Sequence, residues 1–342
     1  MPYKYSNLDN ELKNKFGFKK EYSLSLAQSY DRLGYEKKAK RVGDCGSFLE
    51  FGLYDDDSVH LHTANFCKDP LCPMCAWRKS LKIYNQVYSC VNALKDSYNF
   101  IFVTLTCKNC KASELSETLD LLYKSYTNLM RRKRLQFVQG AFKAVEITYN
   151  KTTDEFNPHL HTIWVVPNNY FESSDYLPTG ELVKLWQKSL KVEYTPICFI
   201  EKIKSNKKGK DPIASSVAEV AKYPLKCTDF LCFDNDTNDY LVDTLSTALS
   251  GRHMFEFYGV LAEIRKKLNF DDIENSDLIN INEDKVNTAI LIACLRFIWS
   301  SDSKSYVMVD VVEPCKDELL QGLKPAGDWR ACSDGRTGGS LF

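Results

Sequence analysis

The stretch "GAFKAVEITYNKTTDEFNPHLHTIWVV", from Gly140 to Val166, contains two runs of strand-forming residues separated by a polar segment. Runs rich in β-branched and aromatic residues on either side of a polar turn predict an antiparallel β-hairpin. Successive strand side chains point to opposite faces, so His159 and His161 share one face of the second strand. The hairpin therefore places two imidazoles side by side.

A carboxylate of the first strand can join these imidazoles. If the turn is symmetric about Asn150 and Asn157, Glu146 lies directly opposite His161, with the two Cβ atoms ~5 Å apart. A shift of one residue would move Glu146 to the other face. Together with His159, these side chains would hold a metal ion with open positions, where the ion polarises a phosphate oxygen as a Lewis acid. The alternative for the His-x-His pattern alone is a pair of solvated or buried histidines.

Other elements with clear patterns surround the hairpin. Residues 99–108 and 195–203 are dense in strand-forming side chains and predict two further strands. Apolar residues at 115–129 recur at steps of four and three, which predicts a helix with Ser113 as its cap. Residues 179–191 predict another helix. The hairpin is thus expected to lie among both strands and helices.

A tyrosine follows a segment that favours a helix, "DPIASSVAEVAKYPLK". Glu219 and Tyr223 are four residues apart and therefore face the same way. Pro224 disfavours helical geometry at the preceding residue, so Tyr223 is expected at or near the helix end. A phenol can act as a nucleophile that forms a covalent intermediate. The alternative is an ordinary pair of surface side chains.

The chain contains 13 cysteines, and their spacing predicts a structural zinc site. The segment "CKDPLCPMCAWRK" supplies three thiolates and "GDCGSF" a fourth. The four are Cys45, Cys67, Cys72 and Cys75. Four thiolates complete a closed tetrahedral zinc site. His60 and His62 could replace one thiolate, although their alternation fits a small strand. Cys107 and Cys110 form a second close pair, which stays unassigned.

Composition predicts a globular protein. The chain has 342 residues, 44% of them hydrophobic, which is enough to bury a core. The N-terminus lacks an apolar signal core and no apolar run approaches ~20 residues, so a cytoplasmic protein without a membrane partner is expected. Residues 271–342 carry 13 acidic and 7 basic side chains, and the remainder is mildly basic. Two basic clusters, at 131–134 and 202–210, could follow phosphates, although the first could instead complement a helix C-terminus.

Four motifs together resemble a known family. In chain order they are the knuckle "CPMCAWRK", the strand "FVTLT", the metal strand "NPHLH" and "EVAKYPLK". They resemble the rolling-circle replication initiators (Rep) of small multicopy plasmids, a branch of the HUH endonucleases with a single catalytic tyrosine. The likeness covers roughly residues 41–270.

The resemblance implies an α+β fold, with a central antiparallel sheet flanked by helices and an N-terminal zinc-binding subdomain. The expected divisions are an N-terminal helical region with the zinc finger at 1–95, the HUH nuclease domain at 96–270, and an acidic region with a flexible end at 271–342. Within the last region, the sequence favours a helix at 287–301 and a strand at 305–313.

The resemblance also implies roles for individual residues. His159 and His161, with Glu146 as the third ligand, would bind a catalytic Mg²⁺ or Mn²⁺ ion. Tyr223 would nick one DNA strand, which leaves a 5′-phosphotyrosine and a 3′-hydroxyl primer. Glu219 would activate water at termination, so that the second cleavage leaves no second adduct.

Two further positions match or depart from the family pattern. Lys226 fits the Tyr-x-x-Lys pattern and would orient the phosphate or balance its charge. Relatives commonly show His-Pro-His-x-His, and this chain has Asn157 in place of the first histidine. That first histidine is not one of the paired ligands, so the metal site is expected to be retained.

The implied partners are plasmid origin DNA, single-stranded at the nick site, together with a host helicase and DNA polymerase. A homodimer is also expected. Three other functions compete with this interpretation. An HUH relaxase or single-strand transposase would use the same chemistry, but it explains the four cysteines and the Glu219–Tyr223 pair less well. A non-haem Fe(II) oxygenase also uses two histidines and a carboxylate. A non-catalytic zinc-finger DNA-binding protein would need only the basic body.

Overall fold

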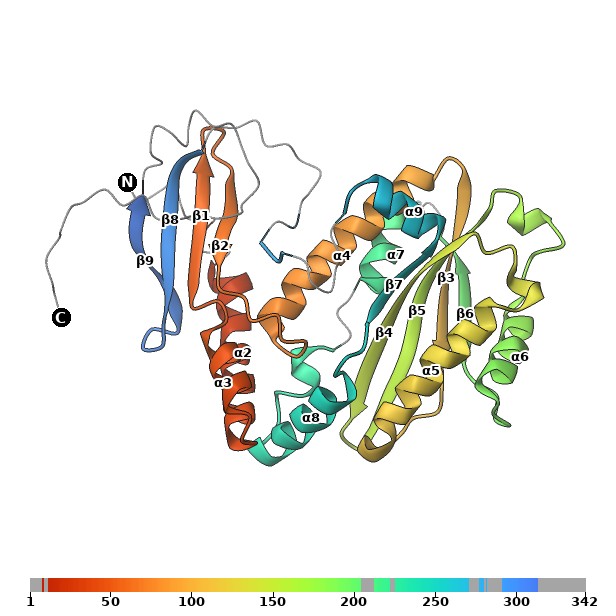
Figure 1. Ribbon diagram of the computed structural model, residues 1–342, viewed down its shortest axis with the longest axis horizontal. Coiled ribbons are helices and arrows are strands. Elements are labelled where there is room, and N and C mark those ends of the chain that lie inside the picture. Colours follow the sequence, from red (N-terminus) through yellow and green to blue (C-terminus); the bar gives the residue numbers. More distant parts are fainter. Residues whose placement is uncertain are drawn as a thin grey trace, which may run out of the picture.

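The computed structural model describes Leu8 and residues 12–203, 212–221, 225–270, 277–279, 281 and 291–312. Its fold is α+β, as the sequence predicts, but with two antiparallel sheets in place of one central sheet (Figure 1). The helices of the described residues are η1 (Leu12–Gly17), α2 (Phe18–Arg32), α3 (Glu36–Asp44), α4 (Pro73–Leu94), η2 (Ala112–Glu114), α5 (Leu115–Met130), η3 (Lys133–Leu135), η4 (Tyr170–Glu172), α6 (Thr179–Leu190), α7 (Pro212–Val220), η5 (Cys227–Asp229), α8 (Asn235–Ala248) and α9 (Val260–Lys267). In the described parts of the chain, no helix is long and apolar enough to cross a membrane.

The larger sheet has five strands in the order β6-β3-β5-β4-β7. Its members are β3 (Tyr98–Thr106), β4 (Gly140–Asn150), β5 (Glu155–Pro167), β6 (Cys198–Lys202) and β7 (Phe255–Gly259). The predicted hairpin, formed by β4 and β5, lies at its centre. Hydrogen bonds to β3 on one side and β7 on the other hold this hairpin from both edges.

Helices cover both faces of the five-stranded sheet. Figure 1 shows α5 and α6 on one face and α4, α7 and α9 on the other. The predicted apolar stripe of α5 is confirmed, because Leu115, Leu119 and Leu129 are fully buried. Ser113 is not the cap of this helix, since it lies inside the short turn η2 and makes no capping hydrogen bond. The Glu114 side chain instead accepts a hydrogen bond from the backbone amide of Lys111, at 3.1 Å.

The second sheet pairs two strands from the N-terminal part of the chain with two strands from the C-terminal part. Its order is β2-β1-β8-β9, from β2 (Val59–Ala64), β1 (Phe48–Tyr54), β8 (Leu291–Ser300) and β9 (Ser305–Val312). The strand predicted at 305–313 is confirmed as β9. The helix predicted at 287–301 is wrong for its described part, which forms β8. β1 and β9 pair with the two edges of β8 and satisfy its backbone hydrogen bonds. This pairing makes the short apolar run a strand, although its sequence also fits a helix.

Contacts between helices connect the N-terminal part of the chain to α8, which lies between β6 and β7 of the larger sheet in sequence. Arg32 of α2 forms an ion pair with Asp239 of α8 at 2.7 Å, and the Tyr35 hydroxyl donates to Asp243 at 2.6 Å. α8 follows the predicted catalytic segment, so the N-terminal helices contact the part of the chain directly after it. The domain boundaries at 95 and 270 remain a prediction, and β8 pairs across both of them with β1.

Candidate active site and metal clusters

The hairpin register differs by two residues from a symmetric turn at Asn150 and Asn157. Asn150 pairs with Glu155 and Glu146 pairs with His159, so Glu146 is not directly opposite His161. The turn is tighter than expected because Asp154 adopts a left-handed conformation, with φ of 50°, and lets β5 begin at once. A shift of two residues preserves the face of every side chain.

Three side chains converge on the face opposite α5. The nearer Glu146 carboxylate oxygen, Oε2, lies 2.8 Å from His161 Nε2 and 3.2 Å from His159 Nε2, and the two Nε2 atoms are 3.1 Å apart. All three residues are half-buried. A carboxylate and two imidazoles at this spacing can hold one divalent cation and leave its remaining positions open.

The outer nitrogens of the two rings have partners that orient them. His159 Nδ1 lies 3.1 Å from the Asn157 carbonyl oxygen, and His161 Nδ1 lies 3.2 Å from the Thr104 hydroxyl of β3. A carbonyl can only accept, so Nδ1 of His159 carries a proton. A cation that displaced the proton from Nε2 would find that nitrogen's lone pair directed toward Glu146. Such partners fix the tautomer of a metal-binding histidine. The backbone of Asn157 thus contributes, although its side chain replaces the family's first histidine.

The charge of this cluster suits a cation. Burial alone would raise the pKa of Glu146, but hydrogen bonds from His159 and His161 outweigh it and hold that pKa well below its usual range. The carboxylate is therefore ionised near neutral pH. An ionised carboxylate beside two imidazoles, whose Nε2 protons a cation can displace, is a competent ligand set.

A second carboxylate, which the sequence did not indicate, lies within electrostatic range of Glu146. Burial raises the pKa of Asp229, the last residue of η5; Lys226 opposes this rise and Glu146 adds to it. Lys226 directly precedes η5 and therefore interacts with Asp229. In the sequence, Asp229 appears only in the segment "KCTD", which does not differ from an ordinary surface turn.

The predicted nucleophile, Tyr223, lies outside the described residues, as do Lys222 and Pro224. The predicted helix before it is α7, which ends at Val220 and packs against β5 on the face that carries the histidines (Figure 1). Glu219 is half-buried in the last turn of α7.

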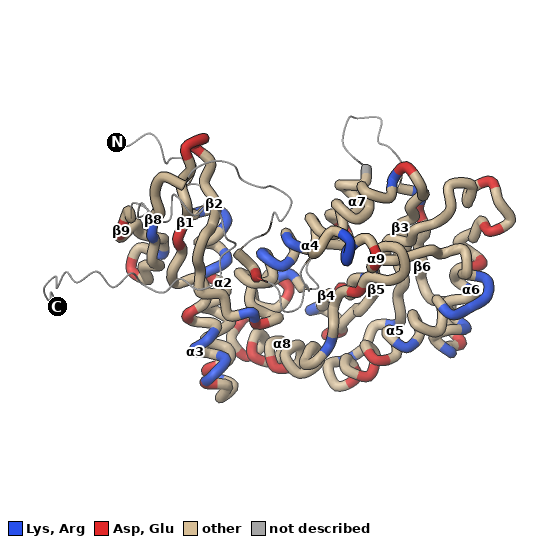
Figure 2. The backbone as a smooth tube through the Cα atoms, turned by 45° about the horizontal axis from the view of Figure 1, so that its top comes forward, with Lys and Arg blue, Asp and Glu red and all other residues tan. Residues whose placement is uncertain are grey.

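α9, which packs against β4 and β7, ends in basic side chains. Arg265, Lys266 and Lys267 form its last turn, and Figure 2 shows Lys and Arg on α9 and α4. Cations at this end also complement the helix dipole. The cluster at 131–134 has structural partners, because Arg134 forms an ion pair with Glu181 at 2.7 Å. Most of the second basic cluster lies outside the described residues.

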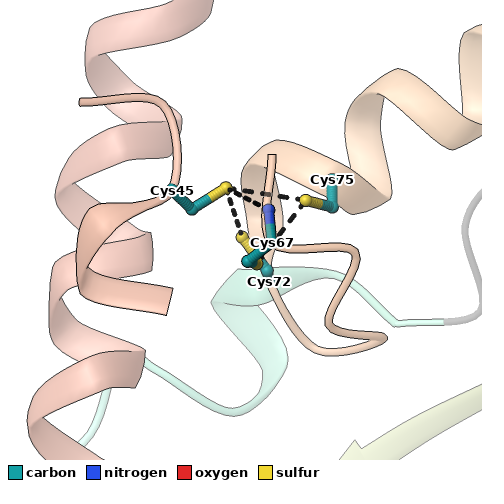
Figure 3. Close-up of side chains that lie close together, drawn as sticks. All are labelled: Cys45, Cys67, Cys72 and Cys75. Atoms are coloured by element: carbon teal, nitrogen blue, oxygen red, sulfur yellow. Dashed lines mark hydrogen bonds between the residues drawn. The ribbon is translucent and has the colours of Figure 1, made fainter. Parts of the chain in front are cut away.

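The four predicted cysteines form a closed cluster (Figure 3). The sulfur of Cys45 lies 3.5 Å from that of Cys75 and 3.6 Å from that of Cys72, and Cys67 lies 3.6 Å from Cys75. Tetrahedral zinc with Zn–S bonds of ~2.3 Å requires sulfurs ~3.8 Å apart. All four residues are buried. Four thiol groups at this spacing fit one structural zinc ion.

Hydrogen bonds to the cysteine sulfurs are also consistent with a structural zinc ion at this cluster. The backbone amide of Lys68 donates to Cys75 Sγ at 3.2 Å, and the Ser23 hydroxyl lies 3.3 Å from Cys72 Sγ. Such donors stabilise thiolates around a cation. His62 belongs to β2, as its alternation predicted, and is not part of this cluster. Cys107 and Cys110 are buried and belong to none of the ligand clusters in the described residues.

Known proteins with similar sequences identify the family. A family model described as "Replication protein" matches residues 58–307. A "Protein rep" of Streptococcus pneumoniae is 33% identical over 89% of this chain and 97% of its own length. Those of Bacillus amyloliquefaciens and Lactiplantibacillus plantarum are 34% and 33% identical, over 85% and 79% of this chain and 92% and 88% of their own lengths. No solved structure gives a significant match. The chain therefore belongs to the Rep family of replication proteins, the family that its motifs resemble.

Proposed function

We propose that this protein initiates plasmid rolling-circle replication by a metal-dependent nick in one strand at the double-strand origin. The observation that carries the proposal is the convergence of Glu146, His159 and His161 beside α7. The two imidazole lone pairs and the ionised carboxylate would hold Mg²⁺ or Mn²⁺. When bound, that ion supplies Lewis-acid polarisation of a phosphate oxygen. The sheet around it would be an HUH core.

The residues of the chain would divide the reaction between them. The Tyr223 oxygen attacks the scissile phosphorus and loses its proton, and the bond from phosphorus to the 3′ oxygen breaks. The 3′ oxygen takes up a proton and leaves as a hydroxyl that a polymerase can extend. Lys226 balances charge on the phosphate. At termination, Glu219 takes a proton from water, whose oxygen attacks the phosphorus of the second scissile bond. The bond from that phosphorus to the 3′ oxygen breaks, the 3′ oxygen takes up a proton, and no second covalent adduct forms.

The proposal includes other cofactors and partners. The cluster of Cys45, Cys67, Cys72 and Cys75 would bind a structural Zn²⁺ ion. Origin DNA would enter single-stranded at the nick, near the cations of α9. A host helicase and DNA polymerase would continue from the free hydroxyl. A homodimer and a cytoplasmic location belong to the same proposal.

The nicking reaction is tested by adduct formation. The full chain is incubated with labelled single-stranded origin oligonucleotides and Mn²⁺, and denaturing gels are run for a DNA adduct that survives SDS. We expect an adduct with the unmodified protein, none with Tyr223→Phe and none with EDTA. Tyr176→Phe is the matched control, because this tyrosine is 49% exposed in a loop and should leave the adduct unchanged.

One result would exclude the nicking chemistry. If origin strands are bound but never cut, with Mn²⁺ or Mg²⁺ present, the catalytic assignment fails. The protein would then be a non-catalytic origin-binding protein of the same family.

A further inference from the structure

A third set of potential metal ligands lies in the four-stranded sheet. Glu50 is on β1, His62 on β2 and Cys294 on β8. One ligand atom from each residue lies within 4.8 Å of the others, and all three residues are half-buried. Cys294 is far from the other two in sequence, and pairing of β1 with β8 brings it to them. Neither the cysteine cluster nor the histidine cluster of the candidate active site shares a residue with this set.

The strand register directs the three side chains to one face. Cys294 pairs with Gly52, and Gly52 shares a face of β1 with Glu50. The pairing of β1 with β2 shifts between Glu50 and Phe51, which leaves His62 as the extra residue of a β-bulge. A bulge re-aims a side chain that would otherwise alternate away. Here the bulge lets His62 lie over β1.

A glycine provides the space for this imidazole. A Cβ atom on Gly52 would lie 2.7 Å from His62 Nε2 and 2.8 Å from a methyl carbon of Leu291. Any other residue would therefore push His62 out of the cluster. The Tyr54 hydroxyl lies 2.7 Å from His62 Nε2 and further restricts the ring. The imidazole is thus held beside Glu50 and Cys294 by shape and by hydrogen bonding.

We propose that Glu50, His62 and Cys294 bind one divalent transition-metal cation of the zinc type. A thiolate, a carboxylate and a neutral imidazole together carry two negative charges, which balance the charge of the cation. This mixture of donors with a water molecule as fourth ligand suits Zn²⁺, and the soft thiolate disfavours Mg²⁺. The site differs from the cysteine cluster, which is closed, because it has a position open to water.

An arginine beside the site fixes the carboxylate and also opposes the cation. Arg296 Nε donates to Glu50 Oε2 at 2.6 Å, and the Thr63 hydroxyl donates a longer bond to Oε1 at 3.4 Å, so Oε1 is the oxygen that a cation would bind more readily. The positive charge of Arg296 weakens cation binding, but Asp310 lies 3.4 Å from its guanidinium and offsets part of it. Hydrogen-bonded carboxylates are usual around protein metal sites. We therefore expect a site that is weaker than the four-cysteine cluster.

The test uses a spectroscopic signal that only a thiolate ligand gives. The full chain is first given one equivalent of Zn²⁺ to fill the four-cysteine cluster and is then titrated with Co²⁺. A thiolate bound to Co²⁺ absorbs in the near ultraviolet, whereas the ligands of the candidate active site contain no sulfur. We expect this band to grow to one further equivalent and to be lost in Cys294→Ser.

Two other variants and one control sharpen the result. His62→Gln and Glu50→Gln should weaken Co²⁺ binding at least ~10-fold, even if the loss of Cys294 disturbs folding. Cys232→Ser is the control, because this exposed cysteine lies outside the ligand clusters of the described residues and its removal should leave the band intact. The proposal fails if zinc-loaded protein gives no band, or if Cys294→Ser gives the same band. The inference does not rest on the nicking activity, which the Tyr223→Phe adduct assay tests separately.

Discussion

Thr104 lies in the strand motif "FVTLT", which assigned no role to its hydroxyl, yet that hydroxyl holds one of the two candidate metal ligands. It lies 3.2 Å from His161 Nδ1, on the strand next to the hairpin. Threonine is an ordinary strand residue, so the sequence alone gave no reason to separate it from its neighbours. The pairing of Thr104 with His161 supplies that reason. Partners of this kind set the ring orientation of a histidine ligand and raise its basicity.

Thr104→Val should therefore weaken metal binding without removal of a ligand. We expect the Mn²⁺ concentration for half-maximal nicking to rise about 10- to 100-fold, with the maximal rate largely kept. Thr106→Val is the matched control on the same strand, because its hydroxyl donates to the Ile197 carbonyl and not to an imidazole. Equal metal dependence of the two variants would contradict the positioning role.

Glu219→Ala separates the two cleavage steps. Its carboxylate is proposed to activate water only at termination, so the first covalent adduct should form at a near-normal rate. The second cleavage, by water, should slow by about 10²- to 10⁴-fold, as expected for loss of a general base. Time courses of adduct formation and of adduct-free cleavage measure both steps. Equal slowing of both steps would assign Glu219 to the site's structure instead.

At the scale of single elements, the sequence predicted correctly those helices and strands that depend on interactions between residues close together in the chain. The α5 stripe, the β4–β5 hairpin and the cysteine knuckle each follow from short-range periodicity or spacing. β8 was predicted as a helix, because its apolar run fits a helix as well as a strand. Pairing with β1, which is far away in sequence, decides between the two. The hairpin register was also out of reach, since it depends on the backbone conformation of Asp154.

The cysteine cluster should stabilise the N-terminal elements as a unit, because it joins the end of α3 to the start of α4. Cys72→Ser should lose one Zn²⁺ per chain and lower the free energy of unfolding by on the order of 5 kcal/mol. Elemental analysis and thermal unfolding measure the two effects. Cys232→Ser, at an exposed position, should keep both the zinc and the unfolding temperature. Unchanged zinc content in Cys72→Ser would show that the cluster is not a zinc site.

At the scale of the whole molecule, the sheet made from both ends of the chain is a single packed unit. Phe51 of β1 contacts Phe297 of β8 with ring centroids 6.0 Å apart, and both residues are buried. A chain that ends at residue 270 would leave β1 with an exposed edge and an uncovered aromatic face. We expect such a chain to form aggregates larger than a dimer and one that ends at residue 312 to form none. Light scattering after size-exclusion chromatography distinguishes them, and a dispersed 1–270 chain would contradict the expectation.

The pairing of β1 with β8 also determines when the nascent chain can complete the four-stranded sheet during translation. Phe48 pairs with Ile298, so 250 residues must be added before the ribosome delivers its partner. At ~5–20 residues per second, that delay is about 12 to 50 s. The five-stranded sheet needs nothing beyond Gly259 and is complete earlier in translation. The first of the described strands to be synthesised is thus among the last to be paired on both edges. During that delay β2 covers one edge of β1, and the edge that β8 will occupy stays open to a chaperone.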